Sequence, residues 1–489
     1  MNETSYAMSA WVLSKGIAFC FILAFLALIP QVMGLYGKNG ILSIQQFMRV
    51  LEEQTGPQRY YELPTIFWFN ASDAFLYFIG GLGLATSTLA LMGFCPPLMM
   101  ITAWVCYLSF VNSGQDFLGF QWDSLLLEVG VLAIFLTPWG FDWKPWTAYE
   151  PSVFVRWLFW ILLFKLMFLS GVVKILSKDF SWRDFTALKY HYWTQPIPNP
   201  LAYFMDKLPL WFQKASCVLM FFIELAVPFL IFIPGPLRWL AAALMIGLQL
   251  LIVLTGNYAF FNVLSIVLCL FLLDDSIWRL FLPKIFPAMT VVTDNPFFYE
   301  SMGLVLAVLM IPLNLFWFGL AFRENSKLLN PAIPIIRAIY NYRFNSSYGL
   351  FAVMTKDRPE LVLQGSNDNE IWVDYEFRYK PSRLDKMPPI VAPYHPRLDW
   401  QMWFAALGTF SQNLWLQNLM ARIFMKSEPV IDLLKNNPFP NAPKYMRLVK
   451  YQYKFSTTKT LFEKGEWWTR EYIGLYSPIF EKTDFVPEE

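Results

Sequence analysis

The chain has 489 residues, of which 56% are hydrophobic, 19% aromatic and only 15% charged. Soluble domains carry about 25% charged residues, so this composition excludes a disordered chain, a coiled coil and an ordinary cytosolic enzyme. It indicates instead a polytopic membrane protein. The formal net charge of +2 provides no basic footprint for nucleic acid, and we expect no nucleic-acid partner.

Nine apolar segments are candidate membrane spans when each crossing needs about 20 residues. They cover residues 11–33, 73–93, 96–112, 121–139, 153–176, 210–233, 237–255, 258–273 and 301–322. The distribution of Lys and Arg does not decide the orientation. Nine crossings nevertheless predict that the two long polar loops, 34–64 and 177–209, lie on the same side of the membrane as the C-terminus. Within the first loop, Ser43 to Gln54 is typical of a short amphipathic helix.

The charge density changes near residue 323. Residues 1–322 carry 16 Lys and Arg with 18 Asp and Glu, whereas the 167 residues from 323 to 489 carry 22 and 18. We therefore expect a helical transmembrane domain at 1–322, a Pro-broken linker at 323–339 and a soluble β-rich domain with a helical insert at 340–489. Alternation and turn residues predict strands at 348–355, 360–364, 371–379, 446–457 and 467–475, with helices across 399–426.

Residues that commonly hold metals or redox groups are few. The five cysteines all lie in or beside apolar segments, none of them in a Cys-x-x-Cys pair, and the chain has only two histidines, His191 and His395. This inventory predicts no disulfide framework, no metal site and no cofactor. The chain contains neither a P-loop nor a Gly-x-Ser-x-Gly nucleophile motif.

Charged side chains inside apolar segments are functional candidates, because burying a charge in a membrane is costly. Five such residues stand out, namely Asp123, Glu128, Lys165, Lys174 and Glu224. Glu128 and Lys165 both fall near the middle of their predicted spans, which favours an ion pair between them. Lys165 and Lys174 are nine residues apart and therefore point to opposite faces of one helix. Lys174 is either a lysine that extends to the membrane surface or a base with a lowered pKa.

Aromatic and charged residues in the long second loop and in the C-terminal part are candidates for partner binding, since Trp, Tyr and Arg are enriched at binding hot spots. The candidates are Trp182, His191, Arg397, Asp399, Trp400 and Trp403. The two histidines are alternatively pH-sensitive polar contacts or simply packed residues.

Several segments together resemble the lipase maturation factors over nearly the whole chain. They are Gly34 to Leu42, Phe120 to Glu128, Lys165 to Lys174, Leu188 to Pro200, Gly256 to Asn262, Gly365 to Asp368 with Trp372, and Ala392 to Trp403. The resemblance implies a non-enzymatic, chaperone-like membrane protein that helps lipases fold and assemble before secretion. The partners it implies are lipase clients and membrane lipids, and the location is the endoplasmic reticulum membrane, or the plasma membrane of a prokaryote. The sequence sets no oligomeric state.

The fifth span also resembles the corresponding segment of vitamin K-dependent gamma-carboxylases. Gly171-Val-Val-Lys174, followed by Asp179 and Trp182, is similar to the segment that carries their base lysine. This second resemblance implies an alternative function: an integral-membrane enzyme with Lys174 as the catalytic base and a quinone or lipid bound between spans. A transporter is a third hypothesis, for which the short third and eighth spans are the support.

Overall fold

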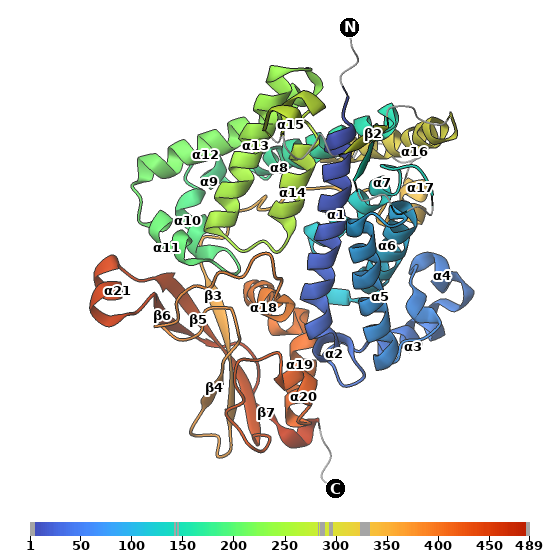
Figure 1. The fold of residues 1–489 in the computed structure, drawn as a ribbon. Coiled ribbons are helices and arrows are strands. Elements are labelled where there is room, and N and C mark those ends of the chain that lie inside the picture. The colour runs from blue at the N-terminus through green and yellow to red at the C-terminus, as the bar shows by residue number, and fades with distance from the viewer. Residues whose placement is uncertain are drawn as a thin grey trace.

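The computed structural model describes residues 5–140, 143, 146–281, 283, 289–292, 297–322 and 333–485. Figure 1 shows a bundle of helices formed by residues up to Phe322 and, at one end of this bundle, a C-terminal region that contains a sheet. We call residues 341–485 the C-terminal region. Residues 323–332 of the expected linker lie outside the described residues. The rest of it, residues 333–339, belongs to the helix α17 (Ile333–Tyr340).

Six helices of the described chain are long and apolar enough to cross a membrane. They are Ala7–Tyr36, which combines α1 (Ala7–Leu28) with α2 (Val32–Tyr36); α5 (Asp73–Met92); α8 (Val153–Leu176); Leu210–Phe232, which includes α12 (Leu210–Leu225); α13 (Pro236–Thr255); and α16 (Phe297–Phe322). The pair α14 (Phe261–Leu270) and α15 (Asp275–Phe281) is bent by 106° and gives a seventh candidate if it counts as one span.

The prediction of nine spans is therefore not confirmed. α7 (Gln121–Ala133) has 13 residues, about 20 Å of helix, whereas the hydrocarbon core of a membrane is about 30 Å thick. α14 is shorter still, with 10 residues. α6 (Pro96–Ser113) is 18 residues long, but it is not among the helices apolar enough to cross. These three segments lie inside the bundle, where neighbouring helices cover them.

Glycines let the first helices approach closely. A Cβ atom built on Gly83 of α5 would lie 2.1 Å from the Phe25 ring of α1, and one on Gly80 would lie 3.1 Å from Ile29.

α8 and α16 run side by side in the same direction. Ser152 and Glu300 form a hydrogen bond near the first residues of the two helices, and Phe168 and Phe322 pack together toward their last residues.

Short helices follow the bundle helices at the end that faces the C-terminal region (Figure 1). These are α3 (Ile44–Thr55), α4 (Arg59–Glu62), α9 (Phe180–Arg183), α10 (Leu188–Thr194) and α11 (Pro200–Asp206). α3 confirms the predicted amphipathic helix. Its first turn is capped by the Ser43 side chain, which accepts a hydrogen bond from the Gln46 N–H.

The C-terminal region contains an antiparallel sheet of five strands in the order β4-β3-β5-β6, with β7 paired to β5. The strands are β3 (Pro359–Ser366), β4 (Val373–Tyr375), β5 (Tyr445–Phe455), β6 (Trp468–Leu475) and β7 (Phe480–Glu481). All eight residues of β3 are buried. The helices are α18 (Arg397–Leu407), α19 (Leu414–Phe424), α20 (Glu428–Ile431) and α21 (Thr458–Lys464). Figure 1 shows α18 to α20 between the sheet and the end of α1.

The predicted strand at 348–355 is wrong. This segment is irregular, and its side chains pack among the bundle helices instead of pairing with β3: Tyr348 is buried and bonds to Glu128, and Phe351 packs against His191 and Tyr258. The alternating pattern that suggested a strand therefore reflects burial inside the bundle. A further pair of strands, β1 (Thr147–Tyr149) and β2 (Thr290–Val292), is parallel and was not predicted.

Candidate functional site

The two long polar loops and the C-terminal region meet at the same end of the bundle. From the first loop, Gly40 O accepts a hydrogen bond from Arg422 Nε at 2.9 Å, and Asn39 O accepts one from Ser427 Oγ at 2.7 Å. From the second loop, Thr194 O accepts a hydrogen bond from Trp403 Nε1 at 2.8 Å. The three segments therefore form one continuous assembly, which we call the platform (34–64, 177–209 and the C-terminal region).

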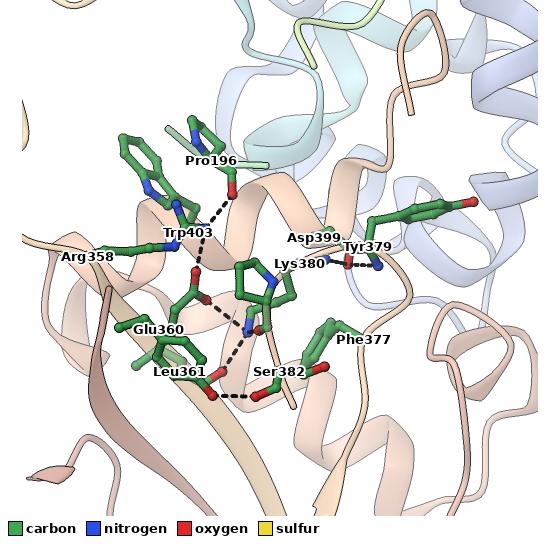
Figure 2. Close-up of polar contacts among 12 residues, drawn as sticks. Pro196, Arg358, Glu360, Leu361, Phe377, Tyr379, Lys380, Ser382, Asp399 and Trp403 are labelled. Atoms are coloured by element: carbon green, nitrogen blue, oxygen red, sulfur yellow. Dashed lines mark hydrogen bonds and ion pairs between the residues drawn. The ribbon is translucent and has the colours of Figure 1, made fainter. Parts of the chain in front are cut away.

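A buried charge cluster attaches the sheet to the second loop (Figure 2). Arg358 donates through Nη1 to Trp193 O at 2.9 Å and through Nη2 to Pro196 O at 2.8 Å. The same guanidinium pairs with Glu360 at 2.7 Å, and Lys380 Nζ pairs with the other Glu360 oxygen at 3.0 Å. All three side chains are at most 2% exposed. Because buried charges are tolerated only when paired and hydrogen-bonded, the cluster fixes loop 193–196 against β3.

Asp399 supports this cluster from α18. Its carboxylate accepts hydrogen bonds from the backbone N–H groups of Tyr379 and Lys380, each at 2.8 Å (Figure 2). Burial raises the pKa of Asp399, and the two backbone donors oppose that rise. The residue therefore orients the chain around Lys380 from inside the protein.

A second ion pair joins α18 to the bundle. Arg397 and Asp123 form two parallel hydrogen bonds of 3.0 Å, and neither side chain is exposed. Arg397 also donates to Phe117 O at 2.8 Å, and Tyr107 donates its hydroxyl to Asp123. This bidentate geometry is the strong form of an Arg–carboxylate contact. The sequence marked both residues as candidates, but gave no signal that they pair.

The predicted ion pair between Glu128 and Lys165 is confirmed at 2.6 Å, with both side chains buried. The C-terminal region completes it. Glu128 accepts hydrogen bonds from the Ser346 N–H at 2.9 Å and from Tyr348 Oη at 2.5 Å, while Asn345 Oδ1 accepts one from Lys165 Nζ at 3.1 Å. The pair therefore fixes the start of the C-terminal region inside the bundle. Sequence reasoning missed Asn345, Ser346 and Tyr348, because they lie outside every apolar segment.

Lys174 pairs with Glu224 of α12 beside an internal cavity. Its ammonium donates to both carboxylate oxygens, at 2.8 and 2.7 Å, and to Ser170 O at 3.0 Å. The Trp182 ring centroid lies 5.6 Å from the same nitrogen, within reach of a cation–π contact. Three acceptor atoms thus take up the three hydrogens of the ammonium group.

The cavity has roughly 210 Å³ of space between α8, α12 and α13, and α10 with Leu350 and Phe351 closes one end. His191 lines it, and its Nε2 lies 3.2 Å from Tyr258 Oη, which donates to Gln195 Oε1 at 3.0 Å. Burial and the nearby Lys174 ammonium lower the pKa of His191 to about 4. The histidine is therefore neutral near pH 7.

The predicted partner-binding residues lie mainly in the interior of the platform. Trp182, Arg397, Asp399, Trp400 and Trp403 are buried, and His191 is partly buried. Trp400 packs edge to face on Trp122 and Phe120 of the bundle. Direct contact of these six residues with a partner stays a prediction; in the structure their neighbours are other parts of the same chain.

The candidate spans, with the buried ion pair of Lys174 and Glu224 between two of them, define an integral membrane protein, and the pair of Arg397 and Asp123 attaches its C-terminal region to one end of the bundle. The family description "Lipase maturation factor transmembrane domain" matches residues 8–280, and "Lipase maturation factor C-terminal domain" matches residues 340–478. The chain belongs to the lipase maturation factor family.

Curated relatives match along almost the full chain. Lipase maturation factor 1 of Mus musculus is 34% identical over 99% of this chain and 89% of its own length. Lipase maturation factor 1 of Homo sapiens is 33% identical over 100% and 90%, and lipase maturation factor 2 of Xenopus laevis is 33% identical over 98% and 83%. No solved structure matches this chain.

Proposed function

We propose that this protein is a membrane-bound maturation factor that helps lipases to fold and assemble before their secretion. The names of the relatives support lipases as the clients. The observation that carries the proposal is the platform: two loops separated by more than a hundred residues bond to the same C-terminal region. A folding helper meets its clients on one face of the membrane, and we place the platform on the lumenal face of the endoplasmic reticulum.

Exposed apolar side chains of the platform are the surface we assign to the client. Tyr61 of the first loop is 76% exposed, Phe462 of α21 is 80% exposed, and Ile473 of the edge strand β6 is 54% exposed. An incompletely folded client exposes apolar side chains of its own, and contact between the two surfaces would cover both. The buried candidates Arg397, Asp399, Trp400 and Trp403 then act through the stability of the platform.

The test is secretion of active lipase from cells that lack their own maturation factor. We expect the intact chain to restore secretion. The single variants Tyr61→Ser, Phe462→Ser and Ile473→Ser should reduce secretion without lowering the amount of membrane-bound protein. Leu309→Ser, an equally exposed change on the outer face of α16, is the matched control and should behave as the intact chain. Failure of the intact chain to raise lipase secretion would contradict the proposal.

The alternative of a membrane enzyme with Lys174 as its base has less support. The amine is held by Glu224 and by Ser170 O, whereas a base needs a free, neutral amine. Lys174→Met combined with Glu224→Gln separates the two functions, because it removes the amine and leaves no unpaired charge. We expect this double variant to support lipase secretion, and quinone-dependent turnover by the purified chain would favour the enzyme.

A further inference from the structure

The cavity beside Lys174 has a lateral opening toward the membrane. Leu251 of α13 lines the cavity and is also 53% exposed, and Ser216 and Phe212 of α12 line it while partly exposed. Both helices are candidate spans. Their outer faces carry apolar side chains such as Val218 and Leu254. What lies outside the opening is therefore the hydrocarbon of a membrane leaflet, not water.

The wall of the cavity is mainly apolar. Leu166, Met167, Met220, Leu248, Ile252 and Phe261 line it. An apolar cavity of about 150 Å³ accepts a benzene-sized ligand, and this cavity is larger. An empty apolar cavity loses the dispersion contacts that its lining atoms would otherwise make. A hydrocarbon chain entering between α12 and α13 would restore them.

The polar groups of the cavity select the kind of head group. Each oxygen of Glu224 accepts one hydrogen bond from Lys174, and a carboxylate oxygen has room for another. Tyr258 has one hydroxyl hydrogen and donates it to Gln195. In the contact between Tyr258 and His191, the hydrogen must therefore belong to Nε2 of His191. The other ring nitrogen, Nδ1, is then an acceptor. Acceptors are therefore left over at this site, and they suit a ligand that donates hydrogen bonds.

A charged head group fits poorly. Among the residues that line the cavity, all within the described part of the chain, Lys174 is the one Lys or Arg, and Glu224 already neutralises it. A carboxylate or phosphate would lie beside the Glu224 carboxylate without a free cation to pair with, and like charges at short range repel strongly in a low dielectric.

We propose that this cavity binds a neutral lipid with a hydroxyl head group, such as a monoacylglycerol or a sterol. The hydroxyl donates to Glu224 or to His191, and the hydrocarbon part lies between α12 and α13 and leaves through the opening at Leu251. This proposal does not rest on the lipase proposal, because it is argued from the lining and the opening of the cavity, to which both the bundle and the platform contribute.

The test uses the full chain in phosphatidylcholine nanodiscs with a monoacylglycerol that carries a photoreactive group in its acyl chain. We expect mass spectrometry to find the label on peptides of α12 and α13. Excess unlabelled monoacylglycerol or cholesterol should prevent labelling. The better competitor shows whether the site prefers a monoacylglycerol or a sterol. The ionised fatty acid of the same chain length should compete about tenfold less well. Equal competition by the fatty acid, or equal labelling of α16, would overturn the proposal.

Two neighbouring substitutions localise the binding. Leu251→Trp places a large ring at the opening, and we expect it to reduce labelling at least fivefold. Leu250→Trp makes the same change at an exposed position that does not line the cavity, and it should leave labelling unchanged. Both residues are already exposed, so both variants should fold. Equal labelling of the two variants would show that the label reports lipid around the bundle and would refute the site. Lipase secretion by the same variants is measured separately, so failure of the site and failure of the maturation role remain distinguishable.

Discussion

α8 and α16 lie side by side and run in the same direction, but they have different surroundings. Two thirds of the apolar window of α8 is buried (67%), against 22% for α16. α8 carries Lys165 and Lys174, each paired with a glutamate from a neighbouring helix, whereas α16 has no charged residue from Ser301 to Phe322. The inner helix therefore holds the ionic contacts of the bundle, and the outer helix presents its side chains to lipid.

This difference shows what the buried charges achieve. Residues 345–348 complete the pair of Lys165, and Arg397 pairs with Asp123 of α7. A buried charge without its partner is strongly destabilising, so the C-terminal region cannot detach from the bundle without a large cost. The inner helices thus position the platform.

The largest effect should follow from removing Arg397. Arg397→Met leaves Asp123 buried without its partner, and we expect the free energy of unfolding to fall by about 3–5 kcal/mol. Thermal unfolding of the detergent-purified protein, followed by size-exclusion chromatography, measures the loss. Arg383→Met is the control, because Arg383 pairs with Asp385 on the surface, and it should unfold like the intact chain. An Arg397→Met protein as stable as this control would contradict the structural role of the pair.

The ion pair between Glu128 and Lys165 of α8 should show a smaller loss in the free energy of unfolding when both of its charges are removed together. Glu128→Gln alone leaves the Lys165 ammonium without a counter-charge and should cost about 3 kcal/mol. Adding Lys165→Met removes that charge, so the double variant should recover part of the stability. A double-mutant cycle in the same unfolding assay measures the coupling between the two residues. Strictly additive losses would show that the pair does not act as a unit.

Acid should weaken the platform moderately through its two histidines. Burial lowers the pKa of His191 to about 4 and that of His395 well below its usual value, so both are neutral in the fold but bind protons near pH 6.5 when unfolded. Their contribution to stability is therefore present above about pH 6.5 and declines as the pH falls toward 4. The midpoint of thermal unfolding, measured from pH 7.5 to 5, should fall less in His191→Gln than in the intact chain. If the unfolding midpoint of that variant fell with pH as much as that of the intact chain, the lowered pKa of His191 would be contradicted.

The smallest effect is expected on α16. Leu309 is 62% exposed, and Leu309→Ala should change the free energy of unfolding by no more than about 0.5 kcal/mol. The matched substitution on α8, Leu163→Ala, removes a buried side chain and should cost about 2–5 kcal/mol. Similar losses for the two variants in the unfolding assay would remove the distinction between inner and outer helices.

Sequence patterns predicted local features well. Apolar length located the bundle helices, amphipathic spacing located α3, and the cost of a buried charge predicted the pair of Glu128 and Lys165. Pairing between distant residues was not predictable, because periodicity reports only on one element. Asp123 and Arg397 are 274 residues apart, and each was a candidate without a partner.

The same limit explains the errors. Tyr348 to Thr355 has an alternating pattern that fits a strand, but its side chains pack in the bundle, which a local pattern cannot distinguish from sheet burial. α8 and α16 are also equally apolar, with mean hydropathies of 2.0 and 2.2. Apolar content shows that a helix avoids water, but it does not show whether protein or lipid covers the helix.

The central claim is that the first loop and the C-terminal region form one platform, and a cross-linking measurement tests it most directly. All five native cysteines are buried, so an added pair, Asn39→Cys with Lys426→Cys, would supply the reactive thiols in the membrane-bound chain. Both positions are exposed, and the bond from Ser427 to Asn39 O places them close together. The account predicts rapid joining by a short bifunctional thiol reagent. It predicts no joining for Asn39→Cys with Glu463→Cys of α21, which lies at the far edge of the sheet (Figure 1). Equal cross-linking of the two cysteine pairs would contradict the account. So would a result in which Cys at position 39 and Cys at position 426 react only with reagents added to opposite sides of the membrane.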